Sequence, residues 1–166
     1  MTVKSKSRLI TALGLLILSA CSPPEAKEKE NTDKASGPFH YSNARFEFTV
    51  TIPDNFIPQG ESDNGDGQIF KSTDGTAEIR AWGGHLMEPE IKCSAIEQFK
   101  DELPTPTYKH SRGGTSVVSG HIGDDILYAK VIRTDDRCLG LTFTYPANEK
   151  DSYDAAVQSA SQSFRG

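Results

Sequence analysis

The sequence lacks a long apolar run and a basic surface, and each absence excludes a class of protein. Its main apolar stretch, residues 9–20, is too short to span a bilayer as a helix, which takes about 20 residues. Lys and Arg total 18 against 23 Asp and Glu, and they form no run after the first eight residues. Proteins that bind nucleic-acid phosphates normally carry a basic patch. We therefore exclude a polytopic membrane protein and expect no nucleic-acid partner.

What is present is enough for one globular domain. The chain has 166 residues, 36% of them hydrophobic and 25% charged, with a formal net charge of -5. Domains of about 100 to 200 residues with this mixture can bury a core. The composition excludes a chain that is disordered throughout or collagen-like.

Catalytic signatures are also missing. The sequence has no Gly-x-Ser-x-Gly elbow, no phosphate-binding loop and no dinucleotide fingerprint. Ser119 and His121 stand close together, but they fall on an expected strand without the sharp turn that exposes a nucleophile. We therefore expect a protein that is not an enzyme and holds no cofactor.

Two patterns resemble metal sites and fail on spacing. Residues 63–67, Asp-Asn-Gly-Asp-Gly, offer alternating oxygens as a calcium loop does, yet Thr73 stands where a bidentate Glu is needed. The four histidines are too dispersed for a zinc site. His110 and His121 cannot be directly opposed across a symmetric four-residue loop at 113–116, because that loop would place residue 119 opposite His110. We expect a solvated turn at 63–67 and no metal.

The N-terminus has the three parts of a lipoprotein signal peptide. Three basic residues within the first eight precede the apolar stretch LITALGLLILSA at 9–20, which has the size of a signal-peptide core. The Leu-Ser-Ala-Cys ending resembles the bacterial lipobox, in which the Cys thiol is lipidated and the chain is cleaved just before it. We predict a signal peptide over 1–20 and acyl chains such as palmitate on Cys21, which anchor the protein to a membrane. A plain secretory signal with an accidental Cys is the alternative.

The residue after Cys21 bears on the destination of the protein. An Asp there commonly marks retention in the inner membrane of bacteria with two membranes, and this chain has Ser22. The resemblance therefore implies the outer membrane, with the domain facing the periplasm. Removal of 1–20 leaves 15 basic and 23 acidic residues, a formal charge of -8, so we expect an acidic mature protein.

Residues 21–38 are predicted to be a lipidated cysteine and a flexible tether. The segment SPPEAKEKENTDKASGP at 22–38 has no large apolar side chain and is rich in charge, Pro and small polar residues. Such a segment cannot bury enough surface to offset the entropy lost on ordering. We predict a single globular domain over 39–166.

The chain has three cysteines, and two of them remain free to pair once Cys21 carries lipid. Because the bacterial envelope is oxidising, Cys93 and Cys138 are predicted to form a disulfide. The bond would close a loop of about 45 residues and tie the start of a short helix to the start of a strand. Two separately buried thiols are the alternative, and the lack of Cys-x-x-Cys argues against a redox pair.

Alternating apolar residues predict antiparallel strands. The segment RFEFTVTI at 45–52 has the period of a half-buried strand, and Pro53 ends it. Three further pairs of segments are predicted to form hairpins. The clearest has its turn at Asp74-Gly75, because a tight turn needs a positive φ and Gly readily adopts one. The paired segments are 68–71 with 77–82, 108–112 with 117–121, and 126–133 with 139–145.

Two segments have the period of a helix. Ser94 and Glu97 form a capping box before a short apolar face that Pro104 ends. Residues 149–164 carry an apolar stripe at helical spacing, with Asn148 as the expected N-cap. Antiparallel strands with two helices predict an α+β fold, a β-sheet flanked by helices.

The order of these elements resembles the PsbP-like α/β/α sandwich. The segments that carry the resemblance are FEFTVTIP, NGDGQIF, STDGTAEIRAWGG and YPANEKDSYDAAVQSASQSF. The fold is shared by photosystem extrinsic subunits, a Ran-binding nuclear factor, the DcrB envelope lipoproteins and adaptor chaperones of type VI secretion. The resemblance implies a DcrB-like lipoprotein domain that binds another protein, and no catalytic residue comes with it.

Trp82, His85 and Met87 lie where an expected strand ends and the following connection begins. An exposed aromatic and Met cluster at such a place suits a protein-binding hot spot. The alternative is that Trp82 and Met87 plug one end of the core.

These features together predict a membrane-anchored envelope lipoprotein that acts as a non-catalytic protein-binding or accessory module. One version is a periplasmic immunity or accessory lipoprotein of a secretion system, because an acidic surface can steer it to a basic effector. The alternatives are a carrier of a small ligand or lipid in a pocket between sheet and helix, and an enzyme.

Overall fold

The computed structural model describes residues 37–87 and 93–166. The chain divides into two units, 1–34 and 35–166, and every described residue belongs to the second unit. The predicted signal peptide, Cys21 and nearly all of the predicted tether lie outside the described residues. Within the described part of the chain, no helix is long and apolar enough to cross a membrane.

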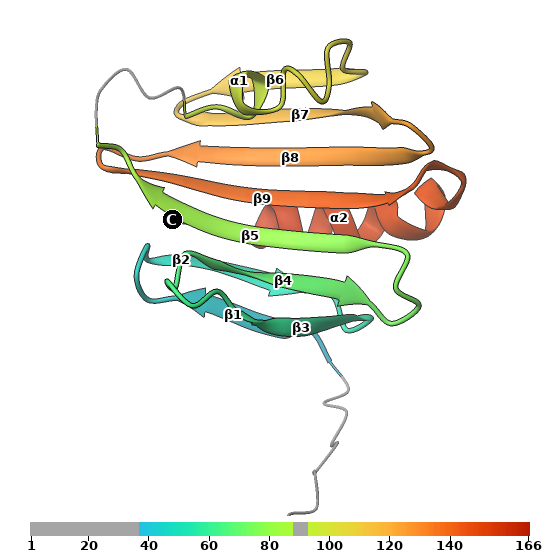
Figure 1. Ribbon diagram of the computed structural model, residues 1–166, viewed down its shortest axis with the longest axis horizontal. Helices are drawn as coiled ribbons and strands as arrows, with labels where there is room; N and C mark the ends of the chain where they lie inside the picture. Colours follow the sequence, from blue (N-terminus) through green and yellow to red (C-terminus); the bar gives the residue numbers. More distant parts are fainter. Residues whose placement is uncertain (1–36, 88–92) are drawn as a thin grey trace, which may run out of the picture. The chain divides into compact units, whose positions relative to one another are not determined.

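Seven strands form one antiparallel sheet in the order β3-β4-β5-β9-β8-β7-β6 (Figure 1). They are β3 (Phe56–Glu61), β4 (Gly67–Ser72), β5 (Glu78–His85), β6 (Tyr108–Arg112), β7 (Thr115–Ile122), β8 (Asp125–Arg133) and β9 (Arg137–Pro146). The three predicted hairpins are confirmed as β4-β5, β6-β7 and β8-β9. The pairing of β5 with β9 joins strands far apart in the sequence at the centre of the sheet.

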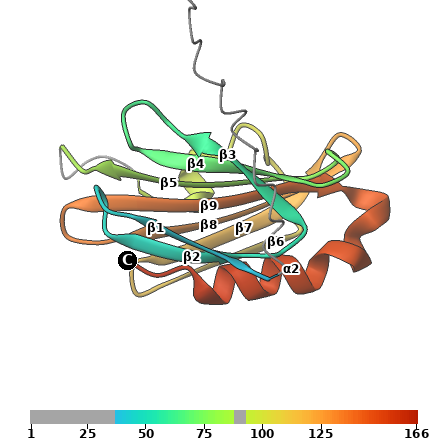
Figure 2. The same cartoon turned by 90° about the horizontal axis from the view of Figure 1, so that it is seen from below.

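One face of the sheet, which we call the α2 face, is covered by a small hairpin and the last helix. β1 (Phe39–Asn43) pairs with β2 (Phe48–Ile52), and helix α2 (Lys150–Ser163) follows a 3-10 turn, η1 (Ala147–Glu149). Figure 2 shows the hairpin and α2 on the same side of the sheet. The apolar stripe of α2 faces this sheet and helps to close the main core. Its largest fully buried side chains include Phe46, Phe48, Phe70, Phe143 and Phe164.

The opposite face, which we call the α1 face, carries a single helical turn, α1 (Ala95–Gln98), packed over β7 and β8. The predicted cap is present, because the Ser94 hydroxyl accepts a hydrogen bond from the Glu97 backbone N–H at 3.2 Å. The predicted disulfide between Cys93 and Cys138 is confirmed, and it joins the residue before this cap to the start of β9. Both half-cystines lie in a second apolar cluster with Ala95, Leu103, Val118, Leu127, Ala129 and Val131.

Three local predictions are wrong. β2 begins at Phe48 instead of residue 45, because residues 44–47 form a turn in which Glu47 has a φ of 52°. Asn148 does not cap α2, because it lies inside η1, and no side chain caps the helix. The loop between β6 and β7 has two residues and not four. Its glycines, 113 and 114, both have positive φ, which lets Arg112 pair directly with Thr115.

Candidate functional site

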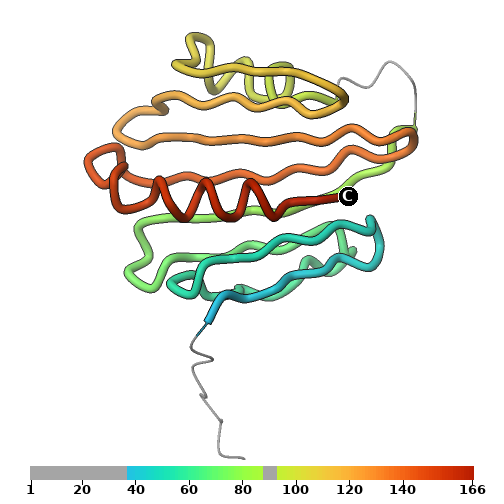
Figure 3. Tube along the Cα trace, turned by 180° about the vertical axis from the view of Figure 1, so that it is seen from behind, coloured from blue at the N-terminus to red at the C-terminus, as the bar shows by residue number. Residues whose placement is uncertain are grey.

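A groove of about 510 Å³ lies on the α2 face of the described structure, between α2 and the strands beyond it. Figure 3 shows α2 running along β9, with β8, β7 and β6 on one side of it. Alternate residues of a strand point to the same face, so one side of each of these strands lines the groove. Its floor comes from Tyr108, Val117, Ser119, His121, Ile126, Tyr128 and Tyr145, and its wall from α2. We call this hollow the α2 groove.

Three tyrosines give the α2 groove an aromatic floor. Tyr108 on the outermost strand is 54% exposed, whereas Tyr145 on β9 is buried and stacks near the Tyr153 ring at 5.3 Å. Tyr128, half-buried between them, has its hydroxyl 2.6 Å from the Ser161 hydroxyl on α2. Burial raises the pKa of Tyr128 and of Tyr145, so both hydroxyls stay protonated at neutral pH. The floor therefore offers apolar rings with neutral hydrogen-bonding tips.

A half-buried cation closes the end of α2 next to the groove. The Lys130 ammonium on β8 donates to the Ser161 carbonyl oxygen at 2.7 Å and lies 5.8 Å from the centre of the Phe164 ring. Burial lowers the pKa of Lys130, and the positive charge of Arg165 lowers it further. A cation at a helix C-terminus can donate hydrogen bonds to the free carbonyl groups there, and it interacts favourably with the negative end of the helix dipole. Lys130 thus fixes the wall of the groove against its floor.

The chemistry available in the groove is packing and hydrogen bonding. Ser119 and His121 both line it from β7, but the hydrogen bonds of the described residues do not join them as a nucleophile and base would be joined. In the ranges 37–87 and 93–166, His, Cys, Asp and Glu form no group of three that could hold a metal ion. At the far end of the wall, Lys150 and Asp154 form an exposed ion pair. The groove is therefore a surface whose available contacts are shape and neutral polar groups.

The structure does not bring Trp82, His85 and Met87 together on one face. Trp82 lies on the α1 face and packs over Gly140 of β9, close to the disulfide cluster. His85 points to the α2 face, where its ring lies 5.0 Å from that of Phe46. Met87 is 82% exposed in the segment after β5. A role for these residues in partner binding stays a prediction.

The residues of the rejected metal patterns have other contacts. The Asp66 carboxylate pairs with Arg45 at 2.8 Å and accepts from the Asn64 amide at 2.6 Å. His40 lies 3.1 Å from the Thr51 hydroxyl at the edge of the small hairpin. His110 opposes Val117 in the register of β6 and β7, and so does not face His121.

The sequence carried a weak signal for the α2 groove. In 126–133 the expected strand places Ile126, Tyr128 and Lys130 on one side, which is an unusually polar pattern for a face that packs under a helix. Tyr108 and Tyr145 stand in different expected hairpins. Their meeting depends on the order of strands in the sheet, which the spacing of residues does not give.

Comparison with solved structures identifies the fold. The chain is similar to the solution structure of CyanoP, the cyanobacterial PsbP protein of Synechocystis sp. PCC 6803, with a TM-score of 0.58 and 9% sequence identity. The alignment covers 78% of this chain and 92% of CyanoP. The fold is PsbP-like. The resemblance predicted from the order of elements is confirmed at this level, as is the α+β class.

Other comparisons add little. A protein of Bacteroides thetaiotaomicron VPI-5482 is 14% identical over 78% of this chain and 48% of its own, with a TM-score of 0.48. No protein-family model and no curated protein sequence matches the chain. The PsbP-like domain is therefore interpreted from its own surfaces.

Proposed function

We propose that this protein is a lipid-anchored envelope lipoprotein whose PsbP-like domain binds another protein in the α2 groove, without catalysis. The observation that carries the proposal is the groove itself, an open hollow of about 510 Å³ with a floor of three tyrosines. Tyr is enriched in protein interfaces because it combines a rigid apolar ring with a polar tip. The lipobox at Cys21 and the outer-membrane destination that Ser22 implies supply the proposed location.

The openness of the groove favours a protein over a small molecule as its occupant. Sites for small molecules generally bury most of the surface of the ligand. Here the outer wall is missing, since Tyr108 is more than half exposed and no helix of the described chain covers β6 on the α2 face. Deeper between sheet and helix, the space is filled by core side chains such as Phe143, Tyr153 and Val157. A partner protein can provide the missing wall.

A carrier of a small ligand or lipid is the second candidate, because the groove does lie between the sheet and a helix. The two candidates differ in what occupies the hollow. A carrier would co-purify with a molecule that fills about 510 Å³, and Ser119→Trp would expel it by filling the floor. A protein-binding module would lose its partner with the same variant and release no small molecule.

Photo-cross-linking in cells tests the protein partner at single positions. The full chain is expressed with p-benzoylphenylalanine in place of Tyr108 or, separately, of Gln158 on the groove side of α2. The matched control places the same amino acid at Ile57, which is 50% exposed and lies on β3 next to Lys71 of β4. We expect one cross-linked product of the same mass from both groove positions and none from Ile57. Equal products from all three positions, or none from the groove, would contradict the proposal.

The anchor has its own test. Cys21→Ser removes the thiol that the lipobox predicts to be acylated, so membrane attachment should be lost. We expect the full chain to incorporate radioactive palmitate and to sediment with outer-membrane vesicles, and Cys21→Ser to do neither. Ser22→Ala is the control, because it keeps the thiol. Sedimentation of both variants without label would refute the lipid anchor and leave the groove proposal standing.

A further inference from the structure

The two edges of the seven-stranded sheet differ in their regularity. At one edge, β3 contains Pro58 and shifts register between Pro58 and Glu61, with Gly60 at a φ of 94°. Proline and irregular pairing are features that prevent an edge strand from accepting another strand. At the other edge, β6 pairs with β7 over five residues without a shift. In the described part of the chain, β6 has no partner on its outer side.

The register shows which backbone groups of β6 are free to pair. Arg112 and Thr115 flank the two-residue loop and therefore form a hydrogen-bonded pair. Hydrogen-bonded and non-hydrogen-bonded pairs alternate along an antiparallel ladder, so the N–H and C=O groups of Lys109 and Ser111 point away from β7. These groups are spaced as an incoming strand requires.

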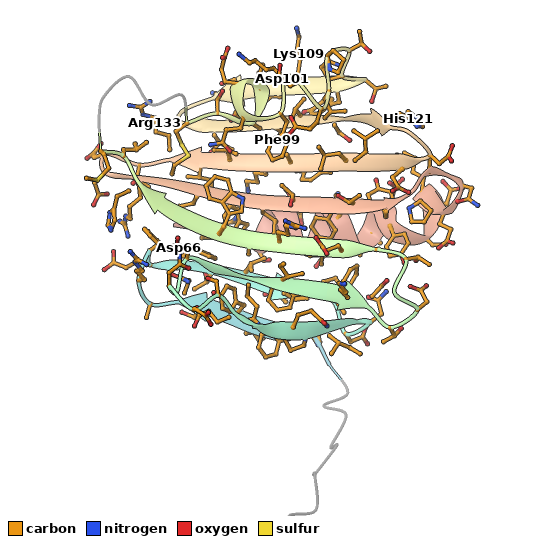
Figure 4. The ribbon with its side chains drawn as sticks, viewed as in Figure 1. Asp66, Phe99, Asp101, Lys109, His121 and Arg133 are labelled. Carbon is orange, nitrogen blue, oxygen red and sulfur yellow. A yellow bond between two sulfur atoms is a disulfide. The ribbon has the colours of Figure 1, made fainter. Side chains whose placement is uncertain are left out.

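The side chains of β6 give this edge a positive charge on an acidic protein. Lys109, His110 and Arg112 lie within five residues that contain no acid, whereas the chain has a net charge of -5. All five side chains are exposed, and Figure 4 shows Lys109 at the free edge of the sheet. Within residues 37–87 and 93–166, neither Lys109 nor Arg112 is within ion-pair distance of a carboxylate. The segment before β6 does carry two exposed acids, Asp101 and Glu102.

We propose that β6 accepts an extended, acidic segment of the partner protein as an additional strand. The inference rests on the proposed function and names the chemistry of the partner. Main-chain hydrogen bonds to Lys109 and Ser111 would hold the segment, and its carboxylates would meet Lys109 on one face and Arg112 on the other. A second copy of β6 is a poor occupant, because it would bring like charges together. Tyr108, which also lines the α2 groove, continues the binding surface from the edge into the groove.

A peptide-binding experiment tests the strand addition. The probe is a fluorescein-labelled peptide that repeats Glu-Glu-Val-Val, which places carboxylates on both faces of an added strand, and the control peptide has Lys in place of Glu. Binding to the full chain in detergent is followed by fluorescence anisotropy. We expect the acidic peptide to bind, more weakly at higher salt, and to slow hydrogen exchange of the Lys109 and Ser111 amides. An acidic peptide that does not bind, or that binds without protecting these amides, would overturn the proposal.

Ser111→Pro separates strand addition from simple charge attraction. Proline removes the outward N–H and leaves the β6-β7 hydrogen bonds, a position that edge strands tolerate. We expect affinity for the acidic peptide to fall about tenfold or more, with Ser111→Ala as the control that keeps the N–H and binds normally. Unchanged affinity in a folded Ser111→Pro would overturn the proposal.

A charge variant covers the case in which Ser111→Pro does not fold. Arg112→Glu should lower the affinity, whereas Lys71→Glu on the α1 face, an equal change in net charge, should not. Equal effects from both would overturn the proposal. If the cross-link from position 108 persists while these edge variants have no effect, the strand addition fails and the groove proposal stands.

Discussion

Replacing Cys93 and Cys138 together with Ala should lower the free energy of unfolding by about 4 kcal/mol. The value follows from the loop that the disulfide closes, because the two residues are 45 apart in the sequence. In the chain-entropy model, a loop of this size restricts the unfolded chain by about 13 cal/mol/K, which is about 4 kcal/mol at 25 °C. Both residues are replaced because a single replacement would leave a free thiol in the cluster on the α1 face.

Urea unfolding followed by circular dichroism measures this loss. With a denaturant dependence of about 2 kcal/mol per molar urea, typical of a small domain, the midpoint should fall by about 2 M. The slope should rise, because the unfolded chain without the disulfide exposes more surface. Reduction of the unsubstituted protein is the control, since it removes the same bond without changing a side chain. A midpoint shift below about 0.5 M with an unchanged slope would refute the argument from loop entropy.

Three further predictions concern packing and titration. Gly140→Ala should lower stability by about 1 to 3 kcal/mol in thermal unfolding, because a Cβ there would lie 2.1 Å from the Trp82 ring. Gly84→Ala is the control and should change stability little, because its Cβ would meet nothing within 4 Å. Asn43→Ala should cost about 1 to 3 kcal/mol, since its buried amide donates to a loop carbonyl oxygen at 2.9 Å and accepts a backbone N–H at 2.8 Å. Burial raises the pKa of Tyr41 to about 12, so the fold favours the protonated phenol. That stabilisation is complete below pH 10 and is lost between pH 10 and 12, and Tyr41→Phe should remove this alkaline loss in a pH series of unfolding measurements.

The sequence was informative where a local pattern decides the structure. Residues 126–133 are rich in β-branched and aromatic side chains and are bounded by turns, so β8 is found almost to the residue. Two edge elements were missed for physical reasons. β1 presents only Tyr41 and Asn43 to the interior, and β3 is interrupted by Pro58 and Gly60, so neither has a clear period. The short helix was overestimated, since its cap at Ser94 was recognised but the chain leaves the helix after one turn at Phe99.

The candidate site depends on information that is not local. Tyr108 and Tyr145 line one groove because β9 is inserted between β5 and β8, so that the last strand lies at the centre of the sheet. No spacing along the chain states that order. The disulfide could be predicted because only one pairing is possible for the two cysteines that remain after Cys21. The sequence does not indicate which of the five tyrosines lie close together.

The last residues of the domain are part of its first hairpin. The backbone N–H of Thr49 in β2 donates to the Arg165 carbonyl oxygen at 2.9 Å, and the Arg165 N–H donates back at 3.0 Å. Neither the small hairpin nor the central strand β5 can complete its pairing until the ribosome has released residues 137–165. Because contacts between distant segments form late and slowly, the complete fold cannot close before these residues have been synthesised. The proposed export of the protein would use this delay, since a translocation channel can thread the domain before the fold closes.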